Sequence, residues 1–405
     1  MTTATVTGIG VAAPTGVGLA AYWSATVAGK GAIDVIGAYD ASGYPSRLAG
    51  EVRDLDAVER VPKKLRPQTD HMTHMALVAA EEALADAGID PLAWPEYEMG
   101  VITANSAGGT VFGQRELQKL WTRGPLHVSA YMSVAWFYAA TTGQLSIRHQ
   151  MRGPCGVLAA DQAGGLDALG QARRVLRGGT RMVLAGGTDA PMSPAGLTAQ
   201  IATRLLSRSD DPARAYLPFD SAAGGFVPAE GGAMMTVEDA AAARGRGVRG
   251  YGVIAGYAAT FDPPPGSARP PALGRAIVRA LADAGVRPDE VDVVLADAAG
   301  VPALDRAEAD ALRGVFGPRG VPVTAPKTTT GRMYAGAGPL DVVTALLAIR
   351  DGVIPPTVNV AEPAPEYQLD LVCGAARPAR LATALVLARG HGGFNSAVVV
   401  RGPDR

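Results

Sequence analysis

The sequence contains few of the residues that build disulfide frameworks, metal sites or charged binding surfaces. Its 405 residues include only two cysteines, Cys155 and Cys373, and five histidines. These numbers exclude a disulfide-stabilised miniprotein and supply no ligand set with zinc spacing, so we expect no metal site. Charged residues make up 19% of the chain, and 37 basic against 38 acidic side chains give a net charge of −1. This balance argues against nucleic acid and membrane lipid as partners, and the low charge suggests that some surface is buried against another subunit.

Targeting and membrane signals are also missing from the sequence. Met1 to Gly10 lacks the basic region, apolar core and cleavage site of a secretory signal, so we expect a cytoplasmic protein. The longest uncharged run, Val128 to Ile147, is long enough for a membrane span but contains several hydroxyl and amide side chains. It is therefore predicted to be a buried or interfacial helix.

An internal repeat is the clearest sign of the architecture. The hexapeptide Ala-Leu-Ala-Asp-Ala-Gly occurs at Ala83–Gly88 and again at Ala280–Gly285. In each copy a periodic apolar segment ends at the glycine and leads to a short buried strand, Gly100 to Ala104 or Val291 to Ala296, followed by a glycine-rich loop. The pattern predicts an α/β protein with two duplicated halves, 1–246 and 247–405, whose sheets are covered by helices on both faces.

A strand-to-helix turn carries the strongest chemical signal. A strand is predicted over Gly156 to Ala160 and a helix over Gly164 to Leu176, which leaves Asp161 and Gln162 in the turn. Such a turn presents one side chain beside free backbone N–H groups, which suits a nucleophile and its developing oxyanion. The amide of Gln162 cannot act as a nucleophile. The residues alone also fit Asp161 as a helix N-cap and Gln162 as an ordinary first-turn residue.

The segment Cys155 to Leu169 resembles the nucleophile segment of β-ketoacyl synthases, with Gln162 in the place of the active-site cysteine. Glutamine before Ala-Gly-Gly-Leu-Asp-Ala resembles the chain length factor, or ketosynthase β subunit, of type II aromatic polyketide synthases. Further matching motifs are Arg152-Gly153-Pro154, Tyr216 to Asp220, Pro228 to Gly232 and the closing Gly390 to Ser396. The resemblance covers nearly the whole chain and implies the thiolase fold, with five layers in the order α-β-α-β-α.

The same resemblance places Asp297 and Arg332 where condensing enzymes carry two catalytic histidines. Aspartate offers no neutral N–H donor at pH 7 and arginine stays protonated, so we expect no independent condensation. Asp297, Arg332 and Lys327 are predicted to form a charge cluster that preserves the shape of the site. Cys155 is predicted to be a small buried residue and Cys373 a strand end. A stand-alone acyltransferase or thiolase-like enzyme that uses either cysteine as nucleophile remains the alternative.

The resemblance implies that the chain pairs with a catalytic ketosynthase α subunit and forms one part of a heterodimeric acyltransferase. The pair would enclose a channel for a poly-β-ketone built from malonyl units on acyl carrier protein. The phosphopantetheine arm would come from that carrier, and the chain itself would bind no cofactor. Tyr131 and Met132 are candidates for contact with the partner subunit, and ordinary core packing is the alternative for both.

The expected product length depends on a short helical segment. Thr110, Gly113 and Leu117 match channel-gating positions of the family and share one helix face. Ala195 and Leu197 lie where some members carry larger rings. These small residues predict a decaketide to dodecaketide, unless they only pack against their own core.

Two further residues of the implied site have open roles. Gln162 either hydrogen-bonds a malonyl thioester oxygen and aids decarboxylation, or it only fills the space of the cysteine. His391, in the glycine-rich closing loop, is predicted to lie near the mouth of the site, and a surface or packing role is the alternative.

Overall fold

The computed structural model describes residues 2–264 and 266–403. The strands of the first half are β1 (Ala4–Ala13), β2 (Gly16–Val17), β3 (Ile33–Val35), β4 (Leu48–Gly50), β5 (Met99–Ala104), β6 (Cys155–Leu158), β7 (Met182–Asp189) and β8 (Gly231–Asp239). Its helices are α1 (Leu19–Val27), α2 (Ala57–Arg60), α3 (His71–Asp86), α4 (Thr110–Arg123), α5 (Met132–Ala135), α6 (Ala140–His149), α7 (Gly164–Arg177), α8 (Pro194–Ala202) and α9 (Ala240–Gly245).

The strands of the second half are β9 (Gly252–Phe261), β10 (Val293–Leu295), β11 (Pro322–Thr324), β12 (Val353–Ile354), β13 (Asp370–Leu371), β14 (Arg377–Pro378), β15 (Thr383–Arg389) and β16 (Phe394–Arg401). Its helices are α10 (Leu273–Ala284), α11 (Pro302–Phe316) and α12 (Ala337–Asp351). Short 3-10 turns connect these elements: η1 (Arg66–Gln68), η2 (Pro91–Ala93), η3 (Glu96–Glu98), η4 (Pro125–His127), η5 (Pro288–Glu290), η6 (Pro326–Thr328), η7 (Tyr334–Gly336) and η8 (Pro365–Tyr367).

The two halves share one strand order and one set of strand directions. The first half runs β6-β5-β7-β8-β1, and the second runs β11-β10-β15-β16-β9 with β13 added at its edge. In both, the first two pairings are parallel and the next two are antiparallel. Strands β1 and β9 pair where Thr5 faces Val253 and join the halves. The predicted duplication is confirmed by this topology.

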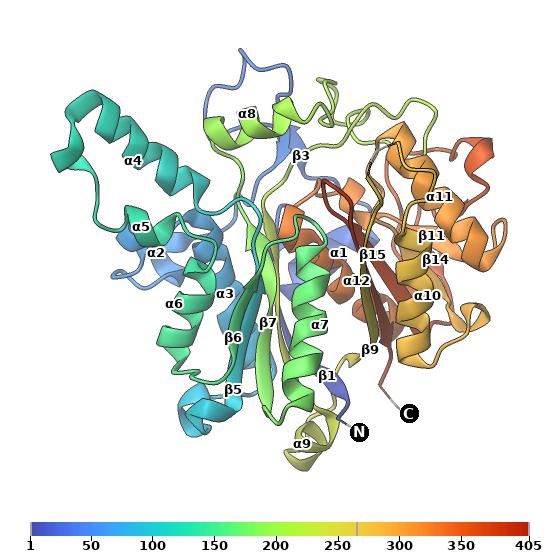
Figure 1. The fold of residues 1–405 in the computed structure, drawn as a ribbon, viewed down its shortest axis with the longest axis horizontal. Helices are drawn as coiled ribbons and strands as arrows, with labels where there is room; N and C mark the ends of the chain where they lie inside the picture. The colour runs from blue at the N-terminus through green and yellow to red at the C-terminus, as the bar shows by residue number, and fades with distance from the viewer. Residues whose placement is uncertain (1, 265, 404–405) are drawn as a thin grey trace.

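Helices form three layers around the two sheets (Figure 1). Helices α3 and α6 cover the outer face of the first sheet, α10 and α11 cover the outer face of the second, and α7 and α12 lie between the sheets. The two copies of the hexapeptide lie at the C-terminal ends of α3 and α10, which are outer helices at equivalent positions in the two halves. The last residue of each copy, Gly88 or Gly285, has a φ of 62° or 63°, a left-handed conformation that favours glycine. The five-layer α/β fold is therefore the thiolase-like arrangement that was expected.

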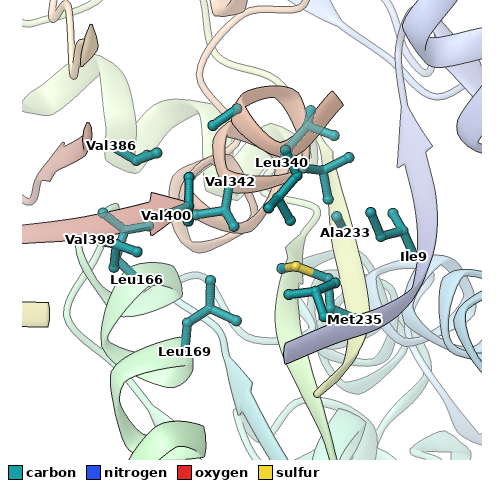
Figure 2. Packing of buried hydrophobic residues seen from close by; sticks show 14 of the residues in the cluster. Ile9, Leu166, Leu169, Ala233, Met235, Leu340, Val342, Val386, Val398 and Val400 are labelled. Atoms are coloured by element: carbon teal, nitrogen blue, oxygen red, sulfur yellow. The ribbon is translucent and has the colours of Figure 1, made fainter. Parts of the chain in front are cut away.

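The largest buried cluster occupies the middle layer (Figure 2). Leu166 and Leu169 of α7 belong to it together with Leu340 of α12, and all three are buried. Side chains from both sheets complete it, such as Met235 of β8 and Val400 of β16. Because α7 is packed on both sides, the turn that precedes it is held in a fixed place, and shortening one of these leucines to alanine should cost about 2–5 kcal/mol.

The uncharged run 128–147 does not form the single helix that was predicted. It folds as α5 and α6, separated by Trp136, Phe137 and Tyr138, whose side chains are exposed. Helix α5 ends at Ala135. The carbonyl of Trp136 accepts the N–H of Gly109, at 3.1 Å, and is therefore bonded to the segment before α4 and not to a following turn of helix. Within the described ranges, no helix is long and apolar enough to cross a bilayer.

The predicted burial of Cys155 is wrong. Cys155 is exposed because it begins β6, which is the edge strand of the first sheet and lacks a neighbour on its outer side among the described residues. Cys373 is half-buried and follows β13, near the strand end that was predicted.

Candidate functional site

A cavity of about 580 Å³ lies at the strand-to-helix turn that the sequence singled out. Gln162, Asp297 and Arg332 all line it, although they come from the β6–α7 turn, the loop after β10 and the loop before α12. The fold therefore brings together the three residues that replace a cysteine and two histidines in the predicted correspondence. We refer to this space as the elbow cavity.

Asp161 connects the elbow to two other loops. Its φ is 50°, and its carboxylate accepts hydrogen bonds from the Ser106 hydroxyl at 3.2 Å and from the backbone N–H of His391 at 2.6 Å. Helix α7 has Ala163 at its N-cap position and no side-chain cap. Asp161 thus bridges loops rather than capping the helix. His391 itself is exposed and lines the cavity, near its mouth as expected.

Gln162 offers an amide to the cavity. The residue is only 4% exposed, and its side chain makes no hydrogen bond to any described residue. The amide can therefore donate to or accept from a molecule in the cavity. None of the described residues that line this space is a cysteine, so the site has no thiol nucleophile.

Asp297 and Arg332 are tied to each other rather than available for proton transfer. The Arg332 guanidinium donates to both carboxylate oxygens of Asp297, at 2.9 and 3.1 Å, and to its backbone carbonyl at 2.6 Å. Both side chains are 3% exposed. The guanidinium also stacks over Phe226, 5.2 Å from the ring centroid. This buried pair forms the predicted charge cluster in part.

The electrostatics keep both members of the pair charged. Burial would raise the pKa of Asp297, but the positive charges of Arg332, Lys327 and Arg389 outweigh it and hold that pKa below its usual range. Burial would lower the pKa of Arg332, but Asp297 raises it instead. Neither group can exchange a proton near neutral pH, which is what the two histidines of a condensing enzyme have to do.

Lys327 belongs to a neighbouring ion pair. Its ammonium contacts the Asp341 carboxylate at 2.7 Å and donates to the carbonyl of Ala296, also at 2.7 Å. Both side chains are buried. Lys327 therefore supports the loop that carries Asp297 without contacting the Asp297 carboxylate.

Two buried carboxylates hold the same loop in place. Glu308 accepts the N–H groups of Asp297 and Ala298, at 2.7 and 2.8 Å. Asp305 accepts the N–H of Gly300 at 3.0 Å. Burial, with the nearby Asp297 charge, raises the pKa of Glu308 to about 7, and burial raises that of Asp305 to about 6. Neither residue was predicted, although acids at the fourth and seventh positions of a helix that follows a glycine-containing loop were the available signal.

An arm extends from the body beside the elbow cavity (Figure 1). We define it as residues 110–138, which include α4, η4 and α5. Its exposed apolar side chains are Val111, Leu117, Trp121, Leu126, Tyr131, Val134, Trp136, Phe137 and Tyr138. Tyr131, a predicted interface residue, is among them, and Met132 is half-buried. An apolar surface of this extent is typical of protein interfaces.

The three predicted gating positions lie in three different environments along α4. Thr110 lines the elbow cavity, Gly113 is buried against Trp136, and Leu117 is exposed on the arm. The structure therefore confirms that they follow one another along a helix, but only Thr110 lines the elbow cavity.

The other two predicted channel residues lie outside the cavity. Ala195 is exposed, and its N–H donates to the Gln114 side chain at 2.7 Å. Leu197 is fully buried in a separate apolar cluster with Met192 and Tyr216. Their neighbours Gly196 and Ala199, by contrast, do line the cavity. Ala195 and Leu197 thus lie on a helix that borders the cavity, and their role in a chain-length channel stays a prediction.

The two cysteines are remote from the elbow cavity, since neither lines it. Burial raises the pKa of the Cys373 thiol to about 11, which leaves little thiolate at neutral pH.

Comparisons with known proteins agree with the duplicated fold. Residues 2–243 match the β-ketoacyl synthase N-terminal domain, and residues 251–361 match the C-terminal domain of that family. The tetracenomycin polyketide synthase ketoacyl synthase β subunit of Streptomyces glaucescens is 59% identical, over 98% of this chain and 97% of its own. The actinorhodin polyketide putative β-ketoacyl synthase 2 of Streptomyces coelicolor is 56% identical, over 98% of both chains.

The α subunit of the tetracenomycin synthase is more distant, at 35% identity over 98% of this chain and 96% of its own. A solved structure of a type II polyketide synthase acyl-carrier protein in complex with its ketosynthase, bound to the hexaketide, superimposes with a TM-score of 0.89 and 28% identity over the whole of both chains. The chain therefore belongs to the β-ketoacyl synthase family, and its relatives within that family include ketosynthase β subunits of polyketide synthases.

Proposed function

We propose that this chain is the non-condensing subunit of a polyketide ketosynthase. It pairs with a cysteine-bearing ketosynthase α subunit, and the pair elongates a malonyl-derived poly-β-ketone on the phosphopantetheine arm of acyl carrier protein. Within the pair this chain sets the length of the product. The reaction class is acyl transfer, and this chain contributes no nucleophile to it.

The observation that carries the proposal is the composition of the elbow cavity. The elbow holds an amide at Gln162, and the buried Asp297–Arg332 pair lines the same cavity at the two positions that the resemblance assigns to histidines. Condensation needs a thiolate to hold the growing chain and groups that exchange protons or donate neutral hydrogen bonds. The three positions therefore supply no thiolate and no imidazole.

The exposed arm supports a partner subunit. Its aromatic side chains would be desolvated only against another surface, and Trp and Tyr are the residues that most often anchor interfaces. The similarity to a β subunit and, at lower identity, to the α subunit of the same synthase supports a heterodimer of two related chains. The related complex of a ketosynthase with its carrier protein supports acyl carrier protein as the second partner.

The predicted product is a decaketide to dodecaketide. The small side chain of Thr110 supports this length because it lines the elbow cavity. A shorter product would contradict the length assignment while leaving the family assignment in place.

Reconstitution tests the proposal directly. Mass spectrometry should detect polyketides when this chain is combined with its partner ketosynthase, acyl carrier protein and malonyl donors, and none from either ketosynthase subunit alone. Product from this chain without the partner would overturn the argument that it lacks a nucleophile.

A decarboxylation role for Gln162 is the second candidate function. Its side-chain amide is buried, faces the cavity and has no hydrogen-bond partner among the described residues, so it is available to a malonyl thioester oxygen. The rate of malonyl-carrier decarboxylation by the pair should fall in Gln162→Ala if the amide acts, and equal rates leave only a space-filling role.

The cysteine-dependent alternative has weaker support. It requires a nucleophile at Cys155 or Cys373, and neither residue lines the elbow cavity. Burial also raises the pKa of the Cys373 thiol.

The proposed substrates, which are carried on acyl carrier protein, are consistent with the cytoplasmic location that the sequence predicts.

A further inference from the structure

The backbone at the end of α5 is in close contact with Gly109, the residue that precedes α4. The N–H of Gly109 donates to the carbonyl of Trp136 at 3.1 Å. A methyl group at Gly109 would lie 2.1 Å from the carbonyl oxygen of Ala135, so only glycine fits at this position. The backbone around residue 136 is therefore fixed against α4 by a contact that no larger residue would allow.

This backbone contact places the Trp136 indole against Gly113. A methyl group at Gly113 would lie 2.7 Å from Cδ1 of Trp136 and 3.5 Å from its Nε1. The absence of a side chain at Gly113 does not leave an empty space, because the ring fills it. The indole is 51% exposed and its N–H makes no hydrogen bond to any described residue.

The position of the ring along α4 gives it a functional meaning. Thr110, one turn before Gly113, lines the elbow cavity, and Leu117, one turn after it, is exposed on the arm. The indole is thus packed on α4 one turn beyond a residue that lines the elbow cavity of about 580 Å³, without lining that cavity itself.

We propose that Trp136 is the side chain that limits product length, and that it separates the channel shared with the partner from the elbow cavity. This inference rests on the proposed function. A poly-β-ketone that enters from the arm side meets the indole at Gly113, and its keto oxygens can accept the free indole N–H. Smaller residues at position 136 would open the elbow cavity to the growing chain.

The test is the product distribution of the reconstituted pair with Trp136→Ala and Trp136→Phe. Trp136→Ala should shift the main product by at least one two-carbon unit toward longer chains, and Trp136→Phe should give a smaller shift in the same direction. The control is Tyr97→Ala, since Tyr97 is an aromatic residue that is 68% exposed on η3, outside the arm and the elbow cavity. It should leave the product length unchanged.

Pair formation is measured alongside by size-exclusion chromatography. Unchanged product length in Trp136 variants that still pair would overturn the proposal. Loss of pairing in both variants, with Tyr97→Ala still paired, would also overturn it and make Trp136 an interface anchor. The wild-type pair separates this inference from the proposed function. If the wild-type pair makes no product, or if one subunit suffices, the proposed function fails before the variants are compared.

Discussion

The elbow cavity and the arm adjoin each other in the structure, yet their side chains have opposite environments. Around the cavity, charged groups are buried and paired, as in Arg332 with Asp297 and Lys327 with Asp341. On the arm, large apolar groups such as Trp121 and Phe137 are exposed. Buried charges without partners and exposed aromatic surfaces are both costly, so each arrangement needs an explanation.

The contrast indicates which region stabilises the chain and which is available to a partner. At the cavity, the buried ion pairs hold the surrounding loops in place. On the arm, the apolar side chains are exposed and no described segment covers them. We expect changes at the cavity to alter the stability of the free chain, and changes on the arm to alter pairing and product.

The largest effect should follow from breaking the buried pair. Arg332→Leu leaves the Asp297 carboxylate buried without its main counter-charge, which should lower the free energy of unfolding by about 3–5 kcal/mol. Urea unfolding of the free chain measures the change. The control is Arg47→Leu, since Arg47 pairs with Asp210 at the surface at 2.6 Å and should show no comparable loss. A loss for Arg332→Leu no greater than for this control would contradict a structural role for the pair.

On the arm, a charged substitution should weaken pairing and leave the free chain stable. Trp121 is 81% exposed, so Trp121→Asp costs little in the monomer but introduces a charge into the proposed interface. We expect the dissociation constant of the heterodimer to rise at least thirtyfold, equivalent to about 2 kcal/mol. Analytical ultracentrifugation measures it. Val278→Asp, at an exposed apolar position on α10, is the control, and an equal effect there would contradict the arm as the interface.

The sequence predicted the cavity better than the arm, and the reason is physical. The duplicated motif and the Gln162 elbow can be recognised from local sequence. The pairing of Asp297 with Arg332 could be predicted because the two residues have opposite charges and lie in two loops that were both expected at the site. The break near Trp136 depends on a backbone contact with Gly109, which is distant in sequence. The exposure of Cys155 depends on strand order, which no local pattern reveals. The aromatic run 136–138 within an uncharged segment was the available signal for a partner surface.

A smaller effect should appear in the pH dependence of stability. Burial raises the pKa of Glu308 to about 7, above its value in the unfolded chain, so the folded protein binds this proton more tightly. The stabilising contribution is full below about pH 4.5 and is lost as the pH rises toward 7. The free energy of unfolding should therefore fall by about 2 kcal/mol between pH 5 and pH 7 on account of Glu308.

Glu308→Gln removes this titration while keeping one acceptor oxygen for the loop N–H groups. The variant is expected to be less stable at pH 5, because Glu308 accepts two such groups, and to have a flatter pH profile. Thermal unfolding at matched ionic strength across pH 5–7 provides the comparison. An unchanged slope would mean that Glu308 is ionised throughout this range.

The smallest expected effect concerns the cysteines, and it tests whether any chemistry takes place outside the elbow cavity and the arm. Cys155 is exposed, whereas burial raises the pKa of Cys373 to about 11, so iodoacetamide at pH 8 should alkylate Cys155 first. Peptide mass spectrometry follows the two rates. Because neither cysteine lines the elbow cavity, the double variant Cys155→Ser and Cys373→Ser should make the same product at the same rate when paired. Loss of product in a variant that still folds and pairs would place a nucleophile in this chain after all, and the buried Asp297–Arg332 pair would then have to be understood as support for a different active site.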